Sequence, residues 1–337
     1  MNTRHLTWVA IFLIITASAA CGPTAPASPA PPSTDVVIQL SWTPNIEFAG
    51  IFAAVKQGFY SAEGLNVVIP PSGFSEDGSY ISAIDKVLSG EAQFGITEGG
   101  DLLLARADGK DLVAVMSIYQ RNPITLVSLA EKGIVRPADL VGHTVDMTFK
   151  TMPLYMALLR SQGIDPASVD TRSRTDPSTA PLLNGSADVI DGWVTNEVVE
   201  LIAQGYDINT IMLSDYGIDA YPNLIFTTQA IVNSNPDLVQ RFVRATIKGL
   251  QAVVTDPNSA AELALAYNDQ LVLEAQKSGM QRALTLLNPS GSQPGRMTDA
   301  TWEFMHRVLV DQGVIAEPID FRKAYTTRFV DQAYASS

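Results

Sequence analysis

The sequence of 337 residues is poor in the residues that most metal sites and covalent enzymes need. It has one cysteine, which excludes an intramolecular disulfide framework and a thiolate metal cluster. Its three histidines, His5, His143 and His306, are too few to predict a histidine zinc site. It also lacks a P-loop, a dinucleotide-binding glycine motif, a nucleophile elbow and a zinc-protease helix motif. We therefore expect a protein that is not an enzyme and that holds no metal or cofactor.

Basic residues are also in the minority. The chain has 22 Lys and Arg against 35 Asp and Glu, so its formal net charge is −13. Proteins that bind nucleic acid neutralise phosphates with a basic surface, and we therefore expect no nucleic-acid partner. The apolar fraction of 46% is typical of a globular protein, and the length predicts two domains in place of a single core.

The first residues have the pattern of an export signal. Arg4 precedes an apolar run, Trp8 to Ile15, which is too short to span a bilayer. Small residues and the only cysteine, Cys21, follow this run. The order resembles a bacterial lipobox, so we expect a signal peptide at residues 1–20 and lipidation of Cys21. The alternative is an ordinary signal peptide, after which Cys21 is an unused thiol.

A tether follows the cysteine. Residues 21–34 are rich in Pro, Ala and Ser, a composition that stays extended and solvated and does not pack. Directly after a lipidated residue, such a segment holds a folded domain away from a membrane. We expect the mature protein to be anchored by lipid to the cell membrane, on its extracytoplasmic side.

From Asp35 onward, apolar strands alternate with amphipathic helices. This alternation predicts an α/β fold with parallel strands and right-handed crossovers. A helical stretch starts at Asn235 and Pro236, a cap followed by a proline in the first turn. We expect strands at residues 36–40, 65–69, 94–97, 112–118, 144–148, 168–172, 188–192 and 224–227, and helices at 48–57, 79–88, 101–107, 154–162, 235–254, 259–267, 271–287 and 299–311.

Polar and aromatic side chains follow several of these strands. Ligands of open α/β sheets bind beyond the carboxyl ends of strands, where loops and helix N-termini converge. Trp42 and Trp193 offer flat rings, whereas Asn45 and Asn196 offer amides that both donate and accept hydrogen bonds. The candidate ligand-binding residues at these positions are Trp42, Asn45, Thr97, Glu98, Tyr119, Thr151, Trp193, Asn196 and Tyr221.

These candidates also have structural interpretations. Trp42 could cap the core at a strand end, and Tyr221, next to a proline, could be a wedge at a hinge. Glu98 could be a solvated carboxylate at the start of a helix. Thr151 is included because it precedes a helix whose first N–H groups are available to a polar ligand. The sequence leaves these alternatives open.

Three segments carry a resemblance to a known family. They read QLSWTPNIEFAG, QRNP and GSADVIDGWVTNE. Over about residues 36–254, the chain resembles bacterial substrate-binding proteins related to the pyrimidine-precursor binders and to yeast thiamine-pyrimidine synthase. The resemblance implies a type II periplasmic binding protein, in which two α/β lobes joined by two crossover strands close on a ligand in a central cleft.

The resemblance also implies an organisation and partners. We expect lobe I at residues 35–124 and 225–337, lobe II at 125–224, and crossovers at 124–129 and 224–227. Such proteins deliver their ligand to an ABC permease that is driven by ATPase subunits. We expect the binding protein itself to be a monomer.

The chain departs in two ways from the synthase branch of this family. The synthase branch has a histidine two residues after the position of Ile46, where this chain has Phe48, and it has a cysteine-rich motif that this chain lacks. The resemblance to riboflavin-binding members implies stacking on a flat ring, with Phe48 in the site and riboflavin as the ligand. A thiamine pyrimidine precursor or another small heterocycle is the alternative ligand. A secreted hydrolase or synthase of the same fold is the alternative class.

Overall fold

The computed structural model describes residues 33–176 and 178–335. The expected signal peptide at residues 1–20, Cys21 and most of the tether lie outside the described residues. The first strand begins at Thr34, the last residue that the sequence assigns to the tether. None of the helices in the described part of the chain is both long and apolar enough to cross a membrane.

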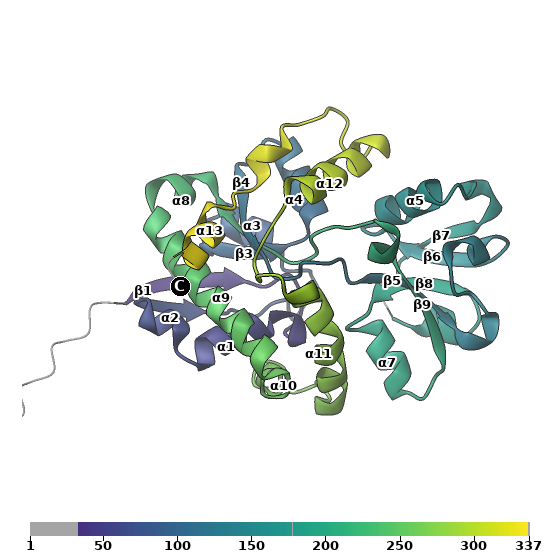
Figure 1. Cartoon of the computed structure of the whole chain (residues 1–337), viewed down its shortest axis with the longest axis horizontal. Coiled ribbons are helices and arrows are strands. Elements are labelled where there is room, and N and C mark those ends of the chain that lie inside the picture. Colours follow the sequence, from purple (N-terminus) through teal and green to yellow (C-terminus); the bar gives the residue numbers. More distant parts are fainter. Residues whose placement is uncertain (1–32, 177, 336–337) are drawn as a thin grey trace, which may run out of the picture. The chain divides into compact units, whose positions relative to one another are not determined.

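A five-stranded sheet forms the centre of the first lobe (Figure 1). Its strands lie in the order β2-β1-β3-β10-β4, and β10 runs antiparallel to both of its neighbours. β1 pairs in parallel with β2 and β3, so the carboxyl ends of these three strands share one edge of the sheet. The strands are β1 (Thr34–Gln39), β2 (Leu65–Val68), β3 (Phe94–Thr97), β4 (Leu112–Ser117) and β10 (Leu224–Thr228).

A second five-stranded sheet forms the other lobe and has a matching arrangement. Its order is β7-β6-β8-β5-β9, with β5 antiparallel to β8 and β9. In each sheet, the antiparallel strand is the first strand after the chain crosses between lobes. The strands are β5 (Ile124–Leu129), β6 (Thr144–Thr148), β7 (Asp170–Arg174), β8 (Val189–Trp193) and β9 (Ile208–Met212). The expected two-lobe α/β fold is confirmed.

The two crossing segments are hydrogen-bonded to each other. The backbone N–H of Asn122 donates to Oδ1 of Asp219 at 2.9 Å, and its side-chain amide donates to the carbonyl of Ile218 at 3.3 Å. The N–H of Ile118 donates to the carbonyl of Asn223 at 2.8 Å. These bonds hold the two crossing segments together just before β5 and β10 begin.

Helices cover both sheets, and most belong to the first lobe. The helices are α1 (Ala49–Lys56), α2 (Phe59–Ala62), α3 (Ala83–Leu88), α4 (Gly99–Ala107), α5 (Met152–Ser161), α6 (Ala180–Leu183), α7 (Glu197–Ala203), α8 (Gln229–Ser234), α9 (Pro236–Thr255), α10 (Pro257–Leu265), α11 (Leu273–Leu287), α12 (Asp299–Asp311) and α13 (Arg328–Ala335). α11 contacts α7, and α12 contacts α5. Two helices of the C-terminal third therefore contact the second lobe.

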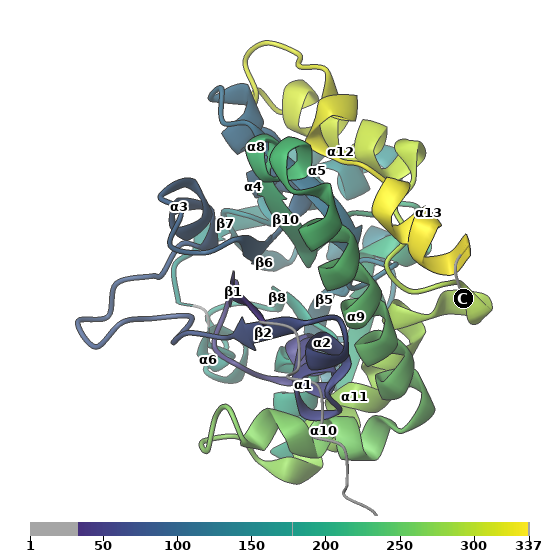
Figure 2. The same cartoon turned by 90° about the vertical axis from the view of Figure 1, so that its left-hand side faces the viewer.

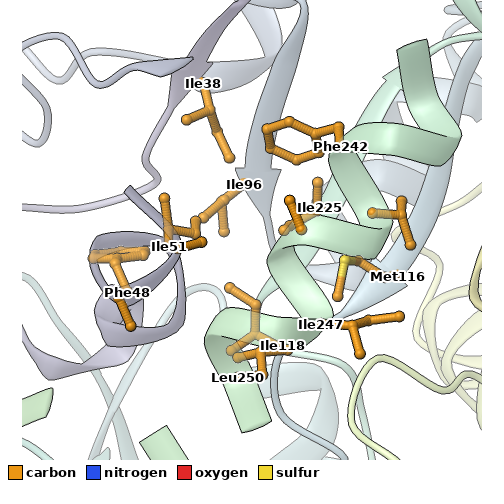
Figure 3. Packing of buried hydrophobic residues seen from close by; sticks show 14 of the residues in the cluster. Ile38, Phe48, Ile51, Ile96, Met116, Ile118, Ile225, Phe242, Ile247 and Leu250 are labelled. Atoms are coloured by element: carbon orange, nitrogen blue, oxygen red, sulfur yellow. The ribbon is translucent and has the colours of Figure 1, made fainter. Parts of the chain in front are cut away.

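The long helix α9 packs its apolar face on the first lobe (Figure 3). Its start is capped as expected, because the Asn235 side chain accepts a hydrogen bond from the N–H of Leu238. Where α9 crosses α1, a Cβ on Gly249 would lie 2.0 Å from the carbonyl oxygen of Gly50. The absence of a side chain at residue 249 lets the helices approach closely. This contact secures α1 and the loop before it.

Several elements differ from those expected. The helix expected from residue 79 begins at Ala83, because Ser82 caps it and Tyr80 bridges back to Phe74 in a hairpin-like turn. Figure 2 shows the loop between β2 and α3 extending from the body of the lobe. β9 and α13 were not expected from the sequence. Neither has a long run of apolar residues, since each is buried on one side only.

Candidate functional site

Polar side chains of the two lobes meet beyond the ends of β3, β6 and β8. Asn196, which follows β8, donates from Nδ2 to Oε1 of Glu47 in the first lobe at 2.7 Å. Lys150, which follows β6, donates to Oδ2 of Asp101 at 2.7 Å and lies 3.5 Å from Oε1 of Glu98. Each of these contacts joins a side chain of the second lobe to one of the first lobe.

The loop before α1 holds Glu47 in place. A short 3-10 helix, Ile46–Phe48, begins after Asn45, whose Oδ1 accepts the N–H of Glu47 at 2.7 Å. The Asn45 amide also donates to Oε1 of Glu47 at 3.3 Å. Gln276 of α11 accepts the N–H of Ile46 at 3.2 Å. The Glu47 carboxyl is therefore held inside the protein at the boundary between the lobes.

Burial raises the pKa of the Glu47 carboxyl from its ordinary 4.5 to about 7. The amides of Asn196, Asn223 and Asn45 oppose this rise, and the like charge of Glu197 adds to it. The carboxyl is thus solvated by amides, and its charge remains without an ionic partner among the described residues.

Three buried polar atoms beside Glu47 have no partner in full hydrogen-bonding geometry: the Tyr119 hydroxyl, the Thr195 hydroxyl and Nδ2 of Asn223. The Asn223 amide is still near enough to lower the pKa of Glu47, and the Thr195 hydroxyl is near enough to lower that of Tyr119. Burial raises the pKa of Tyr119, and the nearby Glu47 charge raises it further. The Trp193 ring lies 6.5 Å from the Tyr119 ring, centroid to centroid. Buried polar atoms are nearly always hydrogen-bonded in native proteins, so three together indicate a place for ligand atoms. We call Asn45, Glu47, Tyr119, Thr195, Asn196 and Asn223 the polar group.

An aromatic cluster lies on the surface of the first lobe, and one of its members, Trp42, is three residues before Asn45 in the sequence. It consists of Trp42, Phe74 and Tyr80, which are 38%, 48% and 45% exposed. The Trp42 and Phe74 rings meet edge to face with centroids 5.1 Å apart. The Tyr80 hydroxyl donates to the carbonyl of Ser41 at 2.7 Å, which fixes the hairpin-like turn against the loop. Three exposed rings in contact form an apolar patch of the kind that marks a binding surface.

The charges of Lys150, Asp101 and Glu98 act on Tyr80 of this cluster. Burial raises the pKa of Glu98, while the Lys150 charge lowers it. Burial lowers the pKa of Lys150, but the carboxylates of Glu98 and Asp101 outweigh this and raise it. Thr97, the residue before Glu98, is buried at the end of β3 and pairs with Leu224 of β10. Glu98 therefore borders the lobe boundary, whereas Thr97 belongs to the sheet.

Thr151 contributes to a buried network inside the second lobe. Its hydroxyl donates to Oδ2 of Asp191, which also accepts the Thr148 hydroxyl at 2.6 Å. Nη2 of Arg174 lies 3.1 Å from Oδ1 of Asp191. The hydroxyl of Thr151 is thus committed to holding the β6–α5 turn that carries Lys150.

Phe48 and Tyr221 lie away from the polar group. Phe48 is fully buried and packs edge to face on Phe52 in the core of the first lobe (Figure 3). Tyr221 is buried, and its hydroxyl accepts the N–H of Thr298 at 2.7 Å. Its ring lies 6.0 Å from that of Trp302. In this arrangement Phe48 fills the core, and Tyr221 is a wedge beside the hinge.

The structure adds residues that the sequence analysis did not select. Glu47, Thr195 and Asn223 complete the polar group, and Phe74 and Tyr80 complete the aromatic cluster. Each of the first three is one or two residues from a selected candidate, so the strand-end rule pointed to the right segments. Phe74 and Tyr80 flank a Ser/Asp/Gly turn, but nothing in the sequence pairs that turn with Trp42.

Other hollows and clusters are separate from this site. Pockets of about 300 and 430 Å³ are lined by residues of Phe321–Ala324 and neighbouring segments, none of which belongs to the polar group. Among the described residues, no three His, Cys, Asp or Glu side chains are placed to hold a metal ion. The lobe boundary is therefore where the chemistry for a ligand is concentrated.

Comparison with known proteins agrees with this architecture. The chain is 31% identical to the riboflavin-binding protein RibY of Chloroflexus aurantiacus over 98% of both chains. It is 26% identical to the formylaminopyrimidine-binding protein of Halalkalibacterium halodurans, over 87% of this chain and 89% of that protein. It is 25% identical to a 4-amino-5-hydroxymethyl-2-methylpyrimidine phosphate synthase of Legionella pneumophila, over 88% of this chain and 92% of the synthase.

Solved structures share the fold at lower identity. The periplasmic sulfonate-binding protein SsuA of Methylobacillus flagellatus superposes with a TM-score of 0.69 at 17% identity, over 90% of this chain and 94% of that chain. Residues 45–260 match the family described as NMT1/THI5 like. This match includes the polar group, every strand of both sheets except β1, and the long helix α9. Together with the relative at 31% identity, it shows that the chain belongs to the NMT1/THI5-like family.

Proposed function

We propose that this protein is the extracytoplasmic substrate-binding component of an ABC importer and that it captures riboflavin between its lobes. The observation that carries the proposal is the polar group, whose buried atoms lack partners at the boundary of the two lobes. Trp193 lies beside it, and the aromatic cluster provides a second apolar surface. The relative at 31% identity is named as a riboflavin-binding protein. A ligand that is a flat ring with a polar edge fits both the aromatic surfaces and the polar group.

Capture then takes place by closure of the lobes. The Asn196–Glu47 and Lys150–Asp101 contacts join residues of different lobes, so they form only when the lobes are close. A ligand that touches both lobes shifts an existing equilibrium between open and closed forms toward the closed one. The hydrogen-bonded crossing segments are the natural hinge for this motion.

Stacking alone does not supply the affinity that such a protein needs. One aromatic face contributes about 1–3 kcal/mol, so two faces contribute about 2–6 kcal/mol. A micromolar dissociation constant requires about 8 kcal/mol. The remainder must come from hydrogen bonds, and the polar group offers unpartnered atoms for them.

Removal of either tryptophan ring should weaken flavin binding. Trp42→Ala and Trp193→Ala are each expected to cost about 1–3 kcal/mol of binding free energy, because each removes one stacking surface. Fluorescence-quenching titration of riboflavin measures this loss. Tyr206→Ala is the matched control, since Tyr206 is an exposed ring beyond the far end of α7.

Two results would count against these roles. Unchanged titration curves for both tryptophan variants would remove the rings from the site. A large fall in the melting temperature of the ligand-free protein would assign Trp193 to core packing, which it also borders.

The charges at the lobe boundary favour a neutral ligand. Glu47, Glu98 and Glu197 lie there, and Lys150 already contacts two carboxylates. We therefore expect riboflavin to bind at least about tenfold tighter than riboflavin monophosphate, a gap of about 1.4 kcal/mol. Parallel titrations with the two compounds measure it. Equal affinities, or tighter binding of the phosphate, would mean that the ligand meets a different set of charges.

The cellular setting is part of the proposal. Lipidation of Cys21 and the tether at residues 21–34 would anchor the folded part to the outside of the cell membrane. An ABC permease with its ATPase subunits would then receive the ligand from a tethered monomer. The support is the lipobox-like order of residues and the Pro/Ala/Ser composition.

Two other functions remain as alternatives with specific support. A thiamine pyrimidine precursor is favoured by the formylaminopyrimidine-binding relative, and an enzyme by the synthase relative. An absorption spectrum of the purified protein distinguishes bound flavin from a bound pyrimidine, because flavin absorbs blue light whereas a pyrimidine absorbs only in the ultraviolet. Titration of ligand-free protein with riboflavin completes the test, and failure to bind it would refute the proposal.

A further inference from the structure

The polar group has more hydrogen-bonding atoms than the protein satisfies. The Tyr119 hydroxyl, the Thr195 hydroxyl and Nδ2 of Asn223 are buried without a partner, and all three residues are at least 95% buried. Leaving a buried donor or acceptor unpaired is unfavourable, because the group has lost its hydrogen bonds to water. Three orphan atoms around one carboxyl therefore indicate that a ligand edge pairs with them.

Glu47 supplies an acceptor at the centre of these atoms. The hydrogen bonds from Asn45 and Asn196 both end on Oε1, which leaves Oε2 to a further donor. Asn223 and Tyr119 lie close enough for their side chains to interact electrostatically with the Glu47 carboxyl. Glu47 can accept a hydrogen bond, Asn223 can donate one, and Tyr119 can donate one.

We propose, on the basis of the proposed function, that Glu47, Asn223 and Tyr119 recognise the cyclic imide edge of the ligand ring. An imide edge, CO–NH–CO, presents an acceptor, a donor and an acceptor in a row. The amide of Asn223 and the hydroxyl of Tyr119 donate to the two carbonyls, and the Glu47 carboxylate accepts the ring N–H. The isoalloxazine ring of a flavin carries this edge, whereas an aminopyrimidine presents an amine beside a ring nitrogen acceptor.

Selectivity for a flavin over an aminopyrimidine would then reside in the polar group. A site built to hydrogen-bond a ligand N–H rejects an analogue that lacks it, because its own buried groups stay unpaired. The aromatic cluster cannot supply such selectivity, since any flat ring stacks on it.

The test uses riboflavin and 3-methylriboflavin, in which a methyl group replaces the imide hydrogen. The wild-type protein is expected to bind the methylated compound about 10- to 100-fold more weakly, because the hydrogen bond to a charged acceptor is lost. Glu47→Ala removes the acceptor and leaves room for the methyl group. In this variant the two affinities should agree within about threefold.

Two further variants guard against a folding defect. Glu47→Gln keeps the shape of the side chain and should give an intermediate ratio, because an amide oxygen still accepts but carries no charge. Glu63→Gln is the matched control: Glu63 is a partly buried carboxyl of the same lobe that pairs with Arg244. Its ratio should equal that of the wild type.

The outcomes separate the two proposals. If the wild type binds riboflavin and its methylated form equally, or if Glu47→Ala keeps the discrimination, the imide assignment is wrong and the proposed function stands. If the wild type binds neither compound, the proposed function fails and the imide assignment fails with it. Discrimination in the wild type that disappears in Glu47→Ala supports both.

Discussion

Replacement of Arg174 by methionine is expected to destabilise the protein by about 3–5 kcal/mol, the range for breaking a buried ion pair. The Arg174 and Asp191 side chains are only 4% and 3% exposed, with Nη2 3.1 Å from Oδ1. Arg174 also donates to the backbone carbonyl of Asp191 at 2.8 Å. Without the guanidinium, the buried carboxylate keeps hydroxyl and N–H partners but loses its only cation in this network.

The same strand provides a matched control. Arg172 lies two residues earlier in β7 and pairs with Asp170, and these side chains are 52% and 55% exposed. Exposed ion pairs contribute about 0–1 kcal/mol, so Arg172→Met should change the stability little. Urea-induced unfolding of both variants, followed by circular dichroism, measures the difference. If Arg174→Met is as stable as Arg172→Met, the buried pair is not what holds the β6–α5 turn.

Stability of the ligand-free protein should fall as the pH rises from about 5 to about 8, and Glu47 should contribute about 3 kcal/mol of this fall. Its pKa is about 7 in the folded protein against an ordinary 4.5, a rise that is worth about 3 kcal/mol. Below pH 4.5 the carboxyl is protonated in both the folded and the unfolded protein, and its full stabilising contribution is present. As the pH rises through 7, the buried carboxyl must ionise, and its contribution to the free energy of unfolding is lost.

The contribution of Glu47 is isolated by comparison with Glu47→Gln. The titratable groups that face it are Tyr119 and Glu197, and these remain in the variant. The wild type should lose stability relative to Glu47→Gln between pH 5 and pH 8. A difference that stays constant over this interval would show that the carboxyl has an ordinary pKa.

Glu63 provides a control of the opposite sign. The Arg244 guanidinium beside it lowers the pKa of its carboxyl. Its stabilising effect is therefore present above the ordinary pKa and is lost as the pH falls. The wild type should lose stability relative to Glu63→Gln on acidification, in contrast to the comparison at Glu47.

Elements with a strong apolar run or a clear helical spacing were predictable from local sequence. β4 is buried along its whole length, and its apolar run gave its position to within one residue. α9 was predicted from its cap and its helical spacing. β9 and α13 were missed because each is short and has few buried residues: one in β9 and three in α13. Local hydrophobicity reports burial, and partly buried elements give a weaker signal.

The candidate site shows the same division. The strand-end rule selected Asn45, Tyr119 and Asn196, which the fold brings together around Glu47. The aromatic ring of Phe48 looked equally suitable, but one turn of helix directs it into the core. A side chain's direction depends on the backbone angles of its element, which a pattern of residue types does not specify.

The sequence by itself determined the fold class, the alternation of strands and helices, and the segments that reach the edge of each sheet, because these follow from local propensity and hydrophobic period. Only the tertiary structure decided which side chains of those segments meet. Glu47 and Asn196 are 149 residues apart in the chain and 2.7 Å apart in space. Their contact, and the burial that raises the Glu47 pKa, depend on the packing of two lobes across a hinge. Such long-range contacts leave no periodic trace in the sequence.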